Sequence, residues 1–409
     1  MLAGYITRAL EPVLKRAASE FPAVVLTGPR QSGKTTLLKR LFSRECHYVS
    51  LEPPDVRAAA SSDPRGLVEM YPPPTIFDEV QYAPDLLPYI KERIDLERDR
   101  PGQYFITGSQ NLLLMQTITE SLAGRAAMLQ LLPLSRSEAA GRPRAKLPWE
   151  TTPRTSKHKM IPLRDLWIDF LRGGFPELAV NRNRDRDIGL WHASYVRTYL
   201  ERDLRNLRQV GDLTQFQNFL RALAGRSAQL LHISDLARDL GVAVNTIKAW
   251  LSVLEASYQV YILRPYFANV GKRLVKTPKV YFMDVGTLCY LAGLKDPEHA
   301  ASGPMGGAIL ETAVLSEIVR SLVHRGLSPD VYFWRTAAGS EVDFVLETGK
   351  RLVPIEVKLS ATPRATMAAG IRELRRDLGD RVDKGVVVHL GDVRLPLGPD
   401  ATAVSFGEF

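Results

Sequence analysis

Short apolar runs alternate with amphipathic stretches along the first third of this 409-residue chain. A continuous apolar run of this kind is typical of a strand that is buried on both faces, as in a parallel sheet. Helical patterns lie between the runs, which is the order that places a parallel sheet between helices. The pattern therefore predicts an α/β fold with a five-stranded, mostly parallel sheet, with strands at residues 23–27, 47–52, 74–81, 103–111 and 126–134.

The middle of the chain has a different pattern. Two helical stretches at residues 233–256 are followed by two apolar strands at about 260–284. The apolar spacing of the second helix turns Asn245, Thr246 and Lys248 to its outer face. The tip between the strands is basic and contains Lys272, Arg273, Lys276 and Lys279. This order predicts a winged helix, in which the second helix enters a DNA groove and wing cations contact phosphates. Winged helices also dock proteins, so that alternative stays open.

The last third reads as a second α/β unit. A helical pattern at residues 306–322 precedes three short strands, a helix at about 362–378 and a strand at 384–390. The stretch at 141–160 is rich in Pro, Thr and basic residues and has no apolar periodicity, so we expect an exposed linker there.

A phosphate-binding motif follows the first predicted strand directly. The sequence "GPRQSGKT" matches G-x-x-x-x-G-K-[ST] without a gap and opens a predicted helix. Its glycines allow backbone N–H groups to approach phosphate oxygens at the helix start. Lys34 would bind the β- and γ-phosphates of ATP, and the Thr35 hydroxyl would bind Mg²⁺. The predicted nucleotide-binding residues are Gly28, Arg30, Gln31, Ser32, Gly33, Lys34, Thr35 and Thr36.

Two acids end the third apolar strand. Asp78 is placed to hold the Mg²⁺ shell, and Glu79 to orient and polarise the attacking water. Thr107, Ser109 and Asn111 follow the fourth strand and could sense the γ-phosphate, although an ordinary turn would carry such residues too.

Six segments occur in one order along the chain: "GPRQSGKTTLL", "IFDEVQYAPDLL", "ITGSQNLLLM", "ESLAGR", "GGFPELA" and "YLERDL". In these segments the chain resembles a bacterial and archaeal family of AAA-type P-loop ATPases with a restriction-endonuclease-like carboxy-terminal region. The resemblance covers nearly the whole chain. It implies an oligomer, a hexamer being the usual ring, in which an arginine completes the ATPase site. Arg125 and Arg202 lie in the matching segments, and a salt bridge is the alternative for each.

The carboxy-terminal strands carry a further set of charged residues. Glu356 and Lys358 are two apart on one strand, so both side chains face the same side. Asp343 on the preceding strand could converge with them in a hairpin. The set looks like the D…E-x-K signature of the nuclease-like family, with Asp343, Glu356 and Glu311 as Mg²⁺ ligands and Lys358 orienting the attacking water. A buried ion pair between Asp343 and Lys358, in a domain that does not cut, is the alternative.

Charge is unevenly distributed. Residues 136–310 contain 26 Lys and Arg against 16 Asp and Glu, whereas the whole chain has a net charge of +9. This excess favours a polyanion such as DNA as partner of the middle third, although a solvated basic face would have the same composition. No apolar run approaches the roughly 18 residues of a membrane helix. Cys46 and Cys289 are far apart in sequence, so we expect a cytoplasmic, reducing location.

We therefore expect four parts: an AAA-type ATPase domain (1–135), a helical lid with basic linker (136–225), a winged helix (226–300) and a nuclease-like domain (301–409). The expected function is Mg²⁺-dependent ATP hydrolysis coupled to DNA, such as branched or unpaired repair intermediates. The alternative is a nucleotide-switched regulator that neither moves along DNA nor cuts it.

Overall fold

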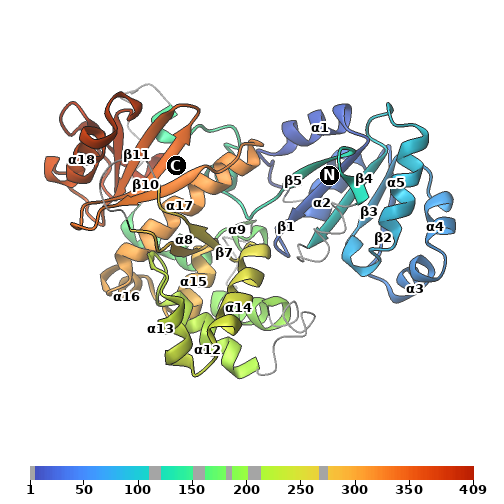
Figure 1. Ribbon diagram of the computed structural model, residues 1–409, viewed down its shortest axis with the longest axis horizontal. Helices are drawn as coiled ribbons and strands as arrows, with labels where there is room; N and C mark the ends of the chain where they lie inside the picture. Colours follow the sequence, from blue (N-terminus) through green and yellow to red (C-terminus); the bar gives the residue numbers. More distant parts are fainter. Residues whose placement is uncertain (1–4, 110–120, 151–161, 181–186, 201–212, 267–274) are drawn as a thin grey trace.

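The computed structural model describes residues 5–109, 121–150, 162–180, 187–200, 213–266 and 275–409 (Figure 1). Among these residues the strands form sheets of five, three and six strands, in chain order. No described helix is long and apolar enough to cross a membrane.

The amino-terminal sheet is parallel throughout, in the order β2-β3-β4-β1-β5. Every residue of β1 and β3 is buried, as their continuous apolar runs require. The predicted five-stranded sheet is confirmed. Because β4 separates β1 from β3, the carboxyl ends of these two strands face one crevice at the sheet edge. The strands are β1 (Ala23–Gly28), β2 (His47–Ser50), β3 (Thr75–Asp78), β4 (Tyr104–Ser109) and β5 (Ala126–Gln130).

Helices cover both faces of this sheet. On one face, α1 (Glu11–Glu20) and α2 (Lys34–Phe42) share a buried apolar core with alternate residues of β1. The other alternate residues of β1 pack with the opposite set of helices. These are α3 (Pro54–Ser62), α4 (Pro64–Met70) and α5 (Leu86–Leu96).

The middle of the chain is mainly helical and includes a small antiparallel sheet in the order β6-β8-β7. Helices α13 and α14 precede β7 and β8, which is the order predicted for the winged helix. The elements are α7 (Arg136–Ala139), α8 (Leu163–Arg172), α9 (Pro176–Val180), α10 (Ile188–Tyr195), α12 (Leu213–Ala224), β6 (Gln229–Leu230), α13 (Ile233–Leu240), α14 (Val244–Ala256), β7 (Val260–Leu263), β8 (Lys279–Phe282), α15 (Val285–Leu291) and α16 (Pro297–Ser302).

The carboxy-terminal sheet is mixed, in the order β13-β14-β12-β11-β10-β9. The predicted order of helix, three strands, helix and strand is found, but the second helix begins later than expected, at Ala369. The elements are α17 (Gly306–His324), β9 (Val331–Arg335), β10 (Glu341–Thr348), β11 (Arg351–Val357), α18 (Ala369–Leu378), β12 (Gly385–His389), β13 (Leu395–Pro396) and β14 (Ala401–Ser405).

Helix α17 is the central element of the molecule (Figure 1). Most of its residues are buried, in one apolar core that extends from the middle helices to the carboxy-terminal sheet. The middle and carboxy-terminal parts are also joined by backbone contacts, since Tyr266 N donates to Phe333 O at 2.7 Å beside β9. These two parts therefore share a continuous core.

Candidate functional site

The phosphate loop joins β1 to α2 at the carboxyl edge of the parallel sheet. Gly28 has φ 148°, and a Cβ there would lie 2.2 Å from the backbone oxygen of Leu131. Gly33 has φ 96°, in the left-handed region that favours glycine. Close packing at Gly28 and the left-handed backbone at Gly33 therefore explain why glycine occupies both positions of the motif. The Lys34 ammonium is buried and donates to the carbonyls of Gly28 and Pro29, at 3.0 Å each.

The Thr35 hydroxyl meets the Asp78 carboxylate beneath the loop. It lies 2.9 Å from Asp78 Oδ1 and 3.0 Å from Oδ2. Tyr48 donates to the same carboxylate at 2.7 Å, and the Thr107 hydroxyl forms a short hydrogen bond with it. A hydroxyl and a carboxylate side by side are the protein ligands that Mg²⁺ takes in P-loop sites, with phosphates and water completing its shell. These donors fit Mg²⁺.

Glu79 lies immediately after β3. Its backbone is left-handed, with φ 61°, and its N–H donates to Thr107 Oγ1 at 3.0 Å. Its carboxylate forms a short hydrogen bond with Gln81. Thr107, predicted as a phosphate sensor, thus contacts both acids in this structure. The side chain of Ser109 and all of Asn111 lie outside the described residues.

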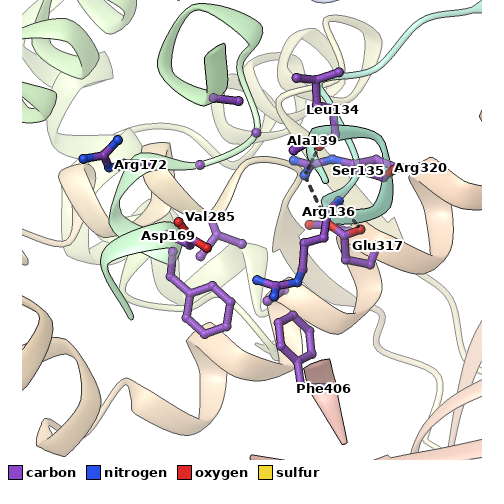
Figure 2. A pocket seen from close by; sticks show the side chains of 16 residues that line it. Leu134, Ser135, Arg136, Ala139, Asp169, Arg172, Val285, Glu317, Arg320 and Phe406 are labelled. Atoms are coloured by element: carbon purple, nitrogen blue, oxygen red, sulfur yellow. Dashed lines mark hydrogen bonds and ion pairs between the residues drawn. The ribbon is translucent and has the colours of Figure 1, made fainter. Parts of the chain in front are cut away.

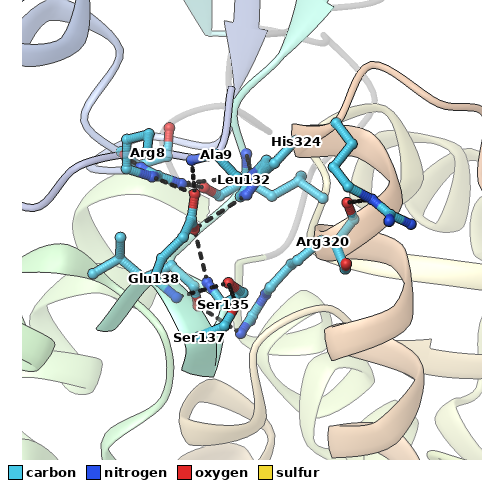
Figure 3. Close-up of polar contacts among 12 residues, drawn as sticks. Arg8, Ala9, Leu132, Ser135, Ser137, Glu138, Arg320 and His324 are labelled. Atoms are coloured by element: carbon cyan, nitrogen blue, oxygen red, sulfur yellow. Dashed lines mark hydrogen bonds and ion pairs between the residues drawn. The ribbon is translucent and has the colours of Figure 1, made fainter. Parts of the chain in front are cut away.

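A buried charged network, which the sequence did not reveal, lies behind the loop (Figure 3). Arg8 donates to the carbonyl oxygens of Ser32 and Leu132 and forms an ion pair with Glu138. Glu138 Oε2 lies 3.1 Å from His324 Nδ1, at the end of α17. Burial would raise the pKa of Glu138, but His324 and Arg8 outweigh it, so the pKa lies well below its usual range. The three charged or titratable members, Arg8, Glu138 and His324, are far apart in sequence, and no local pattern predicts their contact.

Two cavities adjoin these features. One of about 470 Å³ is lined by Gln31 of the phosphate loop and by α9 and α10. The parallel rings of Trp191 and Tyr195, with centroids 5.3 Å apart, lie in its wall. The other, of about 60 Å³, lies between α7, α8 and α17, where the Arg136 guanidinium stacks over Phe406 (Figure 2). That second volume suits a few waters rather than a nucleotide.

The two predicted arginines differ in what can be said of them. Arg125 Nε and Nη2 donate to the two carboxylate oxygens of Asp95 on α5, at 2.6 and 2.9 Å. Within the chain, therefore, the salt-bridge alternative describes Arg125. Arg202 lies outside the described residues.

Some of the predicted DNA-binding residues lie within the described part of the chain and others lie outside it. Asn245 and Lys248 are exposed at the start of α14, and Thr246 is half-buried. Lys276 is exposed, whereas Lys272 and Arg273 lie outside the described residues.

Lys279 is a correction to the sequence analysis. It was expected at the exposed wing tip, but it lies in β8 and is 4% exposed. Its ammonium pairs with Glu341 at 2.5 Å and with Glu311 at 3.2 Å. Burial opposes its charge, but Glu311, Asp343 and Glu341 outweigh that effect and raise the pKa of Lys279. All four residues of β8 are buried, so Lys279 is enclosed and cannot contact DNA phosphates from this position.

The carboxy-terminal set of charged residues lies where β10 meets β11. Lys358 Nζ is 2.6 Å from Glu356 Oε2 and 3.8 Å from Asp343 Oδ2, while Asp343 also accepts from Val357 N at 2.8 Å. Burial and the charge of Asp343 raise the pKa of Glu356 to about 8. The same two causes raise the pKa of Glu311, which also binds Tyr281, to about 7.

Each of these acids is paired with a lysine in this arrangement. Lys358 forms ion pairs with Asp343 and Glu356, and Lys279 forms an ion pair with Glu311. Among the described residues no group of three or more His, Cys, Asp or Glu is placed to hold a metal ion. The expected Mg²⁺ set of Glu311, Asp343 and Glu356 therefore does not fit the ion as arranged here, because each of these carboxyl groups is paired with a lysine.

Three families match successive parts of the chain. The first, described as an AAA domain, matches residues 20–140. Two domains of unknown function follow: DUF8612 at residues 163–298 and DUF4143 at 306–409. The first match agrees with the parallel five-stranded sheet and its phosphate loop.

Two mycobacterial proteins are similar over almost the whole chain. Uncharacterized protein Rv2008c of Mycobacterium tuberculosis (strain ATCC 25618 / H37Rv) is 33% identical over 399 residues, covering 96% of this chain and 81% of the relative. The same figures hold for Uncharacterized protein Mb2031c of Mycobacterium bovis (strain ATCC BAA-935 / AF2122/97).

Among solved structures, the Walker-type ATPase PABY2304 of Pyrococcus abyssi is 17% identical, with a TM-score of 0.43, over 69% of this chain and 94% of the other. A single-substitution variant of RuvB from Thermotoga maritima is 15% identical, with a TM-score of 0.27, over 62% and 85% of the two chains.

Proposed function

The chain belongs to the family of the mycobacterial proteins Rv2008c and Mb2031c, and from this premise we propose that it is a Mg²⁺-dependent AAA-type ATPase whose nucleotide cycle acts on DNA. One observation carries the ATPase part. The Thr35 hydroxyl and the Asp78 carboxylate meet 2.9 Å apart beneath a phosphate loop whose lysine is already buried.

The residues divide the chemistry among them. Lys34, now bound to two loop carbonyls, would transfer its N–H donors to the β- and γ-phosphates. Thr35 and Asp78 would hold Mg²⁺, which neutralises phosphate charge when bound. Glu79, fixed to Thr107 through its backbone N–H, would accept a proton from the attacking water. The cavity beside Gln31 is large enough for a nucleoside.

The DNA part rests on charge and exposure. Asn245 and Lys248 are exposed on α14, Lys276 is exposed before β8, and residues 136–310 carry the excess positive charge. Exposed polar residues at the start of the second helix of a winged helix are placed for groove contacts. Branched or unpaired repair intermediates are the DNA class that we propose.

The test is the ATPase rate with no DNA and with single-stranded, duplex and four-way-junction DNA at one salt concentration. We expect stimulation, strongest with the junction. A rate that is indifferent to all three DNAs would contradict the DNA part and leave the ATPase part standing.

The second candidate is a nucleotide-switched regulator or scaffold. It is favoured by the two lysines that pair with the acidic set, because a nuclease would use these acids to hold a metal ion. Endonuclease activity has support from the D…E-x-K sequence alone.

Because lysines pair with the acidic set, we expect no cutting of DNA when Mg²⁺ or Mn²⁺ is supplied. Cutting that is lost in both Asp343→Ala and Lys358→Ala would reverse this expectation.

A further inference from the structure

Arg8 lies behind the phosphate loop, and all three nitrogen atoms of its guanidinium group make polar contacts. Nη1 donates to Ser32 O at 2.9 Å, and Nη2 donates to Leu132 O at 2.6 Å. Nε lies 3.2 Å from Glu138 Oε1. The side chain is 4% exposed, so these contacts are shielded from water. One of its partners is thus a backbone carbonyl of the phosphate loop itself.

The contact to Ser32 fixes the direction of a loop amide. The Ser32–Gly33 peptide is trans, so the Ser32 C=O and the Gly33 N–H point in opposite directions. While Arg8 holds the carbonyl on its own side, the N–H of Gly33 is directed away from Arg8. A phosphate loop works by turning successive N–H groups toward the anion. If this peptide rotated, a carbonyl oxygen would face the phosphates and repel them.

Gly33 makes such a rotation easy. Its φ of 96° belongs to a region that glycine enters freely, and an added Cβ would meet nothing closer than 3.8 Å. The backbone preference of Gly33 therefore does not hold the peptide in one orientation. The hydrogen bond from Arg8 supplies that constraint.

We propose that Arg8 is a positioning residue of the ATPase site, which orients the Ser32–Gly33 peptide for binding of the nucleotide's phosphate chain. The inference rests on the proposed ATPase function and adds a residue outside the G-x-x-x-x-G-K-[ST] motif. It assigns Arg8 no contact with the nucleotide.

The rest of the network holds Arg8 in place. Glu138 accepts from Ala9 N at 2.7 Å and from Ser135 N at 3.0 Å, so its carboxylate is fixed by backbone donors. His324 Nε2 accepts from Leu132 N at 3.1 Å, which requires that this nitrogen carry no proton. The orientation of the loop peptide therefore depends on the position of α17, which carries His324 (Figure 3).

The test compares two buried arginines at the same junction. Arg8→Lys keeps the positive charge beside Glu138 but cannot donate to two carbonyls with a fixed planar fork. Arg320→Lys is the matched control, because Arg320 is equally buried and donates to Leu134 O at 3.1 Å without touching the loop. For each variant the Kd of ATP and the Kd of inorganic tripolyphosphate are measured, together with kcat, KM and melting temperature.

We expect Arg8→Lys to raise both Kd values by the same factor, about tenfold or more, because the lost constraint acts on the phosphate chain. KM should rise with kcat nearly unchanged, since ground state and transition state lose the same interaction. Arg320→Lys should lower the melting temperature and leave both Kd values unchanged.

Each other outcome has a definite meaning. If ATP binds wild type and Arg8→Lys equally, or if Arg320→Lys weakens binding as much, the inference is wrong. If wild type itself does not bind ATP, the proposed function fails instead. Should Arg8→Lys not fold, Glu138→Asp is used. Its shorter carboxylate displaces the guanidinium, and the same parallel rise of both Kd values is expected; unchanged values would overturn the inference.

Discussion

Lys34 of the phosphate loop and Glu79 just after β3 have separable roles in the proposed ATPase site. Lys34→Ala should abolish ATP binding, because the phosphates lose their counter-charge. Glu79→Gln should bind ATP like wild type and lose turnover by about 10²-fold or more, since the amide cannot accept a proton from water. Equilibrium binding and steady-state turnover of the same preparations check both statements.

Glu92→Gln on the exposed face of α5 is the matched control for these two variants, because Glu92 pairs with the exposed Arg65, away from the phosphate loop. It should behave like wild type in both assays. Turnover of Glu79→Gln at the wild-type rate would show that another group activates the water.

Buried histidines link stability to pH at the same residue scale. Burial lowers the pKa values of His324 and His192 below 6.5 in the folded protein. Below about pH 6.5 the unfolded chain therefore binds protons that the folded chain does not, and stability falls as the pH falls. The raised pKa values of Glu311 and Glu356 act in the opposite direction. The contribution of one histidine is therefore measured by comparing the pH dependence of the melting temperature in wild type and in a variant that lacks that histidine.

We expect the melting temperature of His324→Gln to fall less than that of wild type between pH 7.5 and 5.5. Calorimetric or fluorescence melting at matched ionic strength measures this difference. Equal slopes in both proteins would mean that His324 does not titrate differently on unfolding.

At the scale of elements, β8 joins two parts of the chain through one buried ammonium. Lys279→Met would leave Glu311 without its cation and Glu341 with Arg335 alone, at a cost of about 3–5 kcal/mol in the free energy of unfolding. Lys276→Met removes an exposed lysine three residues earlier and should change it by about 0.5 kcal/mol or less. Urea unfolding compares them. Equal midpoints would show that the Lys279 pairs contribute nothing.

Helix α10 lines the cavity beside Gln31, which we expect to hold the nucleoside of ATP. Ser194 is exposed and lies in that lining. Ser194→Trp should therefore raise the Kd of ATP at least tenfold, about 1.4 kcal/mol, and leave that of tripolyphosphate unchanged. Ser252→Trp, on an exposed face of α14, is the control. Unchanged ATP affinity in Ser194→Trp would place the nucleoside elsewhere.

Elements with a local cause were predictable from the sequence. The strands of the parallel sheet are continuous apolar runs, and the phosphate loop needs residues at one fixed spacing. Contacts between distant positions were not predictable. Lys279 was expected at an exposed tip because the surrounding residues are basic, and only the partners Glu311 and Glu341 explain its burial. The same reason hid Arg8 and Glu138, which are 130 residues apart.

At the scale of the whole molecule, the prediction concerns assembly into an oligomer. An AAA-type site that takes an arginine from a neighbour works only in an oligomer, and Arg125 would have to leave Asp95 to serve that purpose. We expect Mg²⁺ and ATP to promote a ring, usually a hexamer, in Glu79→Gln but not in Lys34→Ala. Sedimentation velocity measures this. A monomer with full ATPase activity would contradict it.

The path of α17 has a consequence for how this protein can be recombined with its relatives. The helix has 19 residues and is about 28 Å long; it carries Glu311 of the acidic set in its second turn and His324 at its last residue. The amino-terminal parallel sheet and its helices therefore depend on contacts with residues that lie later in the chain, Glu138 and His324. A chimera that grafts it onto the remainder of another homologue must transfer Arg8, Glu138 and His324 as one heritable unit, although they come from three separate stretches of the gene.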